Sequence, residues 1–113
     1  MKPILIVSPW FTNLVSIVID VYAITLFPFI ISKEKMGAET LNHETIHIYQ
    51  QRELLLVGFY LLYFYYYLRG VIKYKDKQKA YYMIPFEQEA YEYDNQLDYL
   101  ETRKPYSWTK YKV

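Results

Sequence analysis

The chain contains only two histidines, and they lie four residues apart in the stretch His43-Glu44-Thr45-Ile46-His47. Residues four apart share one face of an α-helix, so a helix at this point lets both imidazoles reach one metal ion. Glu44 follows the first histidine directly, and a carboxylate at that position can take a proton from a metal-bound water. This HExxH pattern predicts a helix with His43 and His47 as metal ligands and Glu44 as a general base.

A zinc site of this kind needs a third protein ligand, because catalytic zinc is usually held by three side chains and one water. The chain has no cysteine and no other histidine, so the third ligand is expected to be a carboxylate. The best candidates lie on a predicted second helix, in the segment Pro85-Phe86-Glu87-Gln88-Glu89-Ala90-Tyr91. Glu87 and Glu89 are about 200° apart around a helix, so only one of them is expected to point inward.

HETIH and the later FExEA segment together resemble the gluzincin arrangement of zinc metallopeptidases, in which a glutamate on a second helix is the third ligand. The chain also resembles short bacterial proteins that pair HExxH with PFExEAY, and the resemblance covers about residues 40–93. It implies a zinc cofactor, a peptide substrate and four site residues: the ligands His43, His47 and Glu87, and the general base Glu44. Glu89 is the second choice for the third ligand.

The chain departs from this family at Tyr91, four residues after Glu87. The peptidases usually have an aspartate there, which orients a ligand histidine through a hydrogen bond. A phenol can also accept a hydrogen bond, but it lacks the negative charge that raises the basicity of the imidazole. The resemblance therefore supports metal binding better than it supports catalysis.

The first thirty-two residues contain three apolar stretches: Pro3–Val7, Leu14–Ile19 and Ala23–Ile31. We expect two or three short strands here, with Pro28 placing the last strand at a sheet edge because proline cannot donate a ladder hydrogen bond. The predicted fold class is therefore α+β, with short N-terminal strands, a long HExxH helix and a second ligand-bearing helix, in a minimal zincin-like arrangement. At 113 residues, the chain is expected to be a single domain spanning 1–113.

The longest helical pattern runs from about Glu39 to Tyr74, as one helix or as two joined near Gly58, with Thr40 as its N-cap. Residues 54–68 carry no charge and include five tyrosines. As a helix they measure about 22 Å, which is short of a hydrocarbon core of about 30 Å. We expect this segment to pack in the core or a homodimer interface, or to lie on a membrane surface.

The remaining expectations concern the end of the first helix, the second helix, the C-terminal tail and the net charge. Gln50 and Gln51 are expected at the surface or an interface, and a helix is predicted from Phe86 to about Leu100. Trp108, in the basic tail, is expected to pack back on the domain. A net charge of +1 argues against nucleic acid as a partner.

Polar residues, among them Asp20, interrupt the apolar N-terminal stretch, which argues against a secretion signal. We therefore expect the protein in the cytoplasm or at the cytoplasmic membrane.

The sequence supports two functional interpretations, beside the alternative that HETIH is a chance match on an ordinary helix face and that no metal binds. The first is a zinc-dependent hydrolase of the peptidase type, in which Glu44 serves as general base. The second is a zinc-binding protein without turnover, in which the metal holds two helices together and the aromatic helix contacts a partner or a membrane. The presence of Glu44 favours the first interpretation, and the small size of the chain favours the second.

Overall fold

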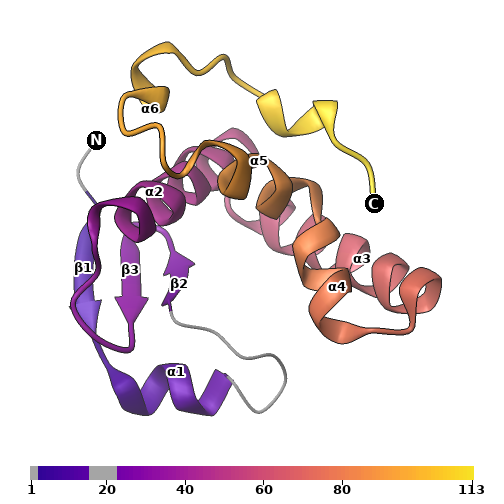
Figure 1. The fold of residues 1–113 in the computed structure, drawn as a ribbon, viewed down its shortest axis with the longest axis horizontal. Helices are drawn as coiled ribbons and strands as arrows, with labels where there is room; N and C mark the ends of the chain where they lie inside the picture. The colour runs from indigo at the N-terminus through magenta and orange to yellow at the C-terminus, as the bar shows by residue number, and fades with distance from the viewer. Residues whose placement is uncertain (1–2, 16–22) are drawn as a thin grey trace.

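A computed structural model describes residues 3–15 and 23–113 and has the predicted α+β class (Figure 1). Its elements in chain order are β1 (Ile4–Val7), α1 (Pro9–Val15), β2 (Ala23–Leu26), β3 (Phe29–Ser32), α2 (Ala38–Glu53), α3 (Val57–Tyr74), α4 (Lys77–Met83), α5 (Pro85–Tyr93), α6 (Tyr99–Thr102) and the short 3-10 helix η1 (Ser107–Lys110). A small sheet is thus followed by a series of helices that supply the candidate ligands.

The three described strands form one mixed sheet in the order β1-β3-β2. β3 pairs in parallel with β1 and antiparallel with β2. The expectation that Pro28 places the last strand at an edge is wrong, because Pro28 lies in the turn before β3 and strands flank β3 on both sides. There Pro28 needs no N–H, and its carbonyl accepts a hydrogen bond from the Ile4 N–H at 2.8 Å.

The predicted apolar stretch at 14–19 begins inside α1 rather than in a strand, and its remainder lies outside the described residues.

α2 and α3 are two separate helices, bent by 113° at a short break. The expectation of two helices is therefore confirmed, and that of one long helix is wrong. Leu55 and Leu56 adopt positive φ angles of 54° and 65° in the break, just before Gly58. The predicted N-cap at Thr40 is wrong: Gly37 is the N-cap, and its carbonyl accepts from the Leu41 N–H at 3.0 Å.

In the described part of the chain, no single helix is long and apolar enough to cross a membrane; α2 and α3 meet that test only as a bent pair.

The core lies between α3, α5 and the C-terminal tail. Phe59, Ile84, Phe86 and Trp108 form one buried cluster. The rings of Phe86 and Trp108 lie 4.8 Å apart, which confirms that the tail packs back on the helices. The predicted second helix is shorter than expected, because α5 ends at Tyr93 and a turn separates it from α6.

α2 packs against β2 and against α5, as Figure 1 shows. The proline that opens α5 stands in its first turn, where the missing N–H costs no helical hydrogen bond. With the sheet on one side and α5 on the other, the HETIH segment of α2 is enclosed, and all of its residues except Thr45 are buried.

Candidate metal centre

The structure brings the three predicted ligand residues together at the contact between α2 and α5. His43 Nε2 and His47 Nε2 each lie 3.0 Å from the same carboxylate oxygen, Oε1 of Glu87. All three side chains are buried, and one ligand atom from each lies within 4.8 Å of the others. In tetrahedral zinc sites of this chemistry, neighbouring ligand atoms stand about 3.3 Å apart, so the group could hold a metal ion after small adjustments.

A second layer of hydrogen bonds orients both imidazoles. His43 Nδ1 donates to Asp94 Oδ2 at 3.2 Å, and His47 Nδ1 donates to Gln50 Oε1 at 2.7 Å. A carboxylate or amide oxygen only accepts, so each Nδ1 carries the hydrogen and each Nε2 is the nitrogen left to bind a cation. Both Nε2 atoms face Glu87, as ligands of one ion must.

The two imidazole nitrogens and the Glu87 oxygen that converge here show whether these residues fit a metal ion. With neutral imidazoles, three lone pairs converge at 3.0 Å with no hydrogen between them, and that arrangement is repulsive. A proton on an imidazole or a cation at the centre removes the repulsion. The donor set of two imidazole nitrogens and one carboxylate oxygen is one that catalytic zinc uses. The residues therefore fit a metal ion by chemistry as well as by spacing.

The charges at this centre shift the pKa values of its members strongly. Burial alone would lower the pKa of His47, but the Glu87 carboxylate and, less strongly, Glu44 raise it to about 9. Burial alone would raise the pKa of Glu87, but the two histidines hold it far below its usual range. The metal-free centre thus keeps a positive charge beside the Glu87 carboxylate at neutral pH.

Tyr63, on α3, fixes the orientation of the Glu87 carboxylate. Its hydroxyl donates to Oε2 of Glu87 at 2.6 Å, so Oε1 is the oxygen that faces the histidines. Burial, together with the neighbouring Glu87 charge, raises the pKa of Tyr63 well above its ordinary value. Tyr63 therefore keeps its proton and remains a hydrogen-bond donor at neutral pH.

Glu44 lies beside the ligand group and is also buried. Its Oε2 accepts a hydrogen bond of 2.5 Å from the Thr25 hydroxyl, which β2 presents toward α2. Burial raises the pKa of Glu44, and the charges of His47 and His43 oppose the shift. The carboxylate is thus held in place by the sheet, next to the histidines.

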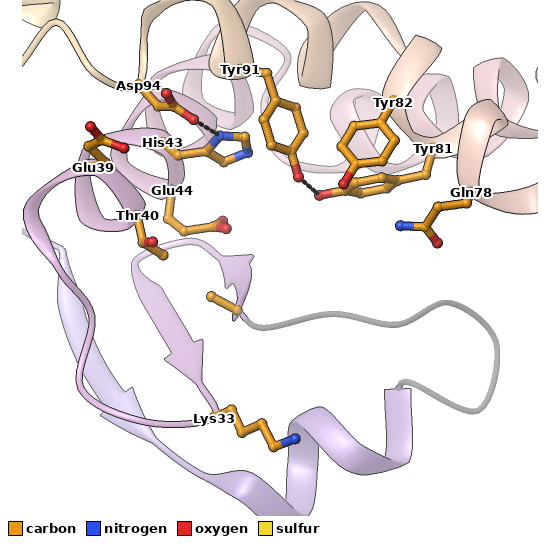
Figure 2. Close-up of a pocket in the computed structure, with 11 residues that line it drawn as sticks. Lys33, Glu39, Thr40, His43, Glu44, Gln78, Tyr81, Tyr82, Tyr91 and Asp94 are labelled. Carbon is orange, nitrogen blue, oxygen red and sulfur yellow. Dashed lines mark hydrogen bonds and ion pairs between the residues drawn. The ribbon is translucent and has the colours of Figure 1, made fainter.

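Two cavities reach this centre, and Glu44 lines both of them. The larger cavity has a volume of about 460 Å³ and polar walls that include His43, Tyr91 and Lys33. Figure 2 shows His43 and Glu44 on one side of it and Lys33 on the opposite side. The smaller cavity, of about 290 Å³, is lined by five aromatic side chains of α3, by residues of β2, and by His47 and Glu87. The site is therefore buried but has space beside it for another molecule.

Glu89, the second choice for the third ligand, has a different role. Both of its oxygens are bound by Arg103, at 2.5 and 3.0 Å, and it also accepts from Tyr99 and Gln50. The expectation that only one of Glu87 and Glu89 points inward is wrong, because both are buried. α5 has protein on two sides, with His43 and His47 on one and Arg103 on the other.

Sequence reasoning missed four residues that support the site: Thr25, Gln50, Tyr63 and Asp94. Gln50, like Gln51, was expected at a surface or an interface, and both are fully buried. Asp94 supplies the carboxylate that the family pattern places where this chain has Tyr91, whose ring instead contacts the His43 ring at 4.3 Å. In the sequence, Asp94 could have been found by its position seven residues, or two helical turns, after Glu87.

No protein-family model matches the chain, and neither a curated protein nor a solved structure matches it. The geometry of the site is therefore the basis for assigning a function.

Proposed function

We propose that this protein is a zinc-dependent hydrolase of the peptidase type, with zinc held by His43, His47 and Glu87. The observation that carries the proposal is the position of Glu44, a buried carboxylate that lies beside three converging ligand atoms and lines both adjoining cavities. A site that only holds helices together has no need for a further carboxylate facing a cavity. Zinc is the metal we assign because two imidazoles and one carboxylate match its preferred ligands.

Glu44 is the residue that we assign to proton transfer. When bound, zinc supplies a Lewis acid and lowers the pKa of a coordinated water toward neutrality. Thr25 holds Oε2 of Glu44, so we assign Oε1 as the atom that accepts the proton from the attacking water. Because burial raises the pKa of Glu44, this carboxyl can hold the proton and later give it to a leaving amine.

A second candidate is a structural zinc site without turnover, and one observation favours it. All three ligand side chains are at most 6% exposed, and they join α2 to α5. Metal binding would then contribute mainly folding free energy. On this interpretation chelation lowers the melting temperature, and no peptide is cut at any metal load.

The test compares the metal content and peptide hydrolysis of the unmodified protein with those of two variants. Glu87→Ala should lose zinc during purification without chelator, because a third of the ligand set is gone. Glu44→Gln should keep zinc and lose hydrolysis by a factor of at least about a hundred. Glu101→Gln, an exposed glutamate, is the matched control and should change neither quantity.

Hydrolysis that survives in Glu44→Gln with zinc still bound would rule out the assigned base. A folded, zinc-loaded parent that cuts no member of a peptide library would favour the structural site instead.

A further inference from the structure

The side of α3 that faces away from the core is apolar along its whole length. Val57, Leu61, Phe64, Tyr65, Leu68 and Ile72 are all exposed, and we call this set the outer face of α3. At 100° per residue, these six positions fall within an arc of about 100°. The opposite side carries Phe59, which packs in the buried cluster with Ile84, Phe86 and Trp108. A helix that is apolar on both sides is normally covered on both sides.

Basic residues follow this face at the C-terminal end of α3. Residues 69–79 contain five exposed basic side chains and one acidic residue, and residues 54–75 contain no acidic residue at all. The single acid, Asp76, accepts hydrogen bonds from backbone N–H groups in the first turn of α4. The surface beside the outer face therefore attracts negative charge.

We propose that the outer face of α3 docks on a membrane surface that contains anionic lipid. Such a surface offers hydrocarbon for the six apolar side chains and negative charge for the lysines and arginine beside them. A second copy of the same helix would add more positive charge and no acidic partner. From Val57 to Ile72 the face is about 22 Å long, which suits a helix lying along the interface.

Docking also places one wall of the smaller cavity beside the lipid. Phe64 belongs to the outer face, lines that cavity, and is 61% exposed. The same cavity reaches Glu44 and His47. If the proposed zinc function is correct, an apolar segment can pass from the membrane surface to the metal centre. That consequence rests on the proposed function, whereas the docking itself does not.

Co-sedimentation with lipid vesicles tests the docking. The unmodified protein should bind vesicles of phosphatidylcholine mixed with phosphatidylserine, and bind phosphatidylcholine alone more weakly. Leu61→Glu, at a position 68% exposed, should weaken binding to the mixed vesicles at least about tenfold. Lys73→Ala should weaken it about fivefold. Leu97→Glu, at a position 60% exposed but outside α3, is the matched control and should bind like the parent.

Circular dichroism and zinc content should be unchanged in Leu61→Glu, which separates a docking defect from misfolding or loss of the metal centre. Equal vesicle binding by Leu61→Glu and the parent overturns the proposal, as does a parent that binds neither vesicle type. Sedimentation velocity tests whether a second copy of the protein occupies the outer face instead. A parent protein that is a dimer, and that Leu61→Glu converts to a monomer, would assign the face to a second copy and overturn the proposal.

Discussion

Gln50 connects His47 to the far side of α5. Its Oε1 accepts from His47 Nδ1 at 2.7 Å, while its Nε2 donates to the Phe86 carbonyl at 3.1 Å and to Glu89 Oε1 at 2.9 Å. The two acceptors fix which end of the amide faces the imidazole. As a result, His47 presents Nε2 toward Glu87, and Gln50 determines the tautomer of a candidate metal ligand.

Gln50→Met should therefore weaken zinc binding without changing the ligand set. The substitution keeps a side chain of similar length but removes the acceptor for Nδ1, so the imidazole loses its fixed tautomer and orientation. We expect the zinc Kd to rise by a factor of about 10 to 100, measured by competition with a chromophoric chelator. Gln96→Met, at an exposed position, is the control. An unchanged zinc Kd in Gln50→Met would mean that Gln50 only fills space.

Zinc should compete with protons at this centre. In the metal-free protein the pKa of His47 is raised to about 9, so the imidazole is protonated at neutral pH and must lose that proton to bind zinc. Zinc affinity should consequently rise about tenfold per pH unit as the pH increases toward 9, and level off above it. Calorimetry in buffers of different ionisation enthalpy measures the proton released at pH 7. Release of no proton would contradict the protonation state inferred for His47.

Much of the site could be predicted from the sequence alone. Helical spacing places His43 and His47 on one face, and the absence of cysteine and of a third histidine leaves a carboxylate as the expected third ligand. The supporting residues depend on packing that no local pattern reveals. Gln50 is polar and lies on a helix, so the default expectation is exposure. It is buried because α5 packs over that face of α2.

The fold shows the same division between local and distant causes. Apolar runs predicted strand β1 and strand structure over 23–31, which the structure divides into β2 and β3, and the helix predicted from Phe86 begins at Pro85. The break between α2 and α3 contains Leu55 and Leu56 at positive φ, a conformation that leucine disfavours. No residue type in that segment predicts it, and Leu55 is 84% exposed. Backbone hydrogen bonds close the break instead: the Leu56 N–H donates to the Gln51 carbonyl at 2.8 Å, and the Val57 N–H donates to the Leu55 carbonyl at 2.7 Å.

Removing Arg103 should destabilise the fold strongly, because this side chain neutralises a buried carboxylate. Its guanidinium binds Glu89 at 2.5 and 3.0 Å and Glu53 at 2.7 and 3.1 Å, and Glu89 is fully buried. Arg103→Met leaves the Glu89 charge without its main partner, at a cost of about 3–5 kcal/mol in unfolding free energy measured by urea denaturation. Arg69→Met, at an exposed position, should cost less than about 1 kcal/mol. Similar losses in both variants would contradict this account.

The same network sets a pH dependence of stability. Burial alone would raise the pKa of Glu89, but hydrogen bonds from Arg103, Tyr99 and Gln50 lower it below its ordinary value of 4.5. A carboxyl with a lowered pKa in the folded state stabilises the protein above pH 4.5, and this contribution is lost as the pH falls below that value. The acid loss of stability should therefore be smaller in Arg103→Met than in the parent.

Gly70→Ala should destabilise the protein although alanine is the better helix former. Gly70 is buried where α3 crosses α4, and an added Cβ would lie 3.0 Å from both Cα and Cβ of Ala80. Separating the two helices should cost about 1–3 kcal/mol, more than the gain of about 1 kcal/mol in helix propensity. Gly37→Ala, with no atom within 4 Å of the added Cβ and an extended backbone, is the control and should be neutral within about 1 kcal/mol. Thermal and urea denaturation of both variants measure the difference. A Gly70→Ala protein as stable as the parent would show that the two helices can separate at this contact without cost.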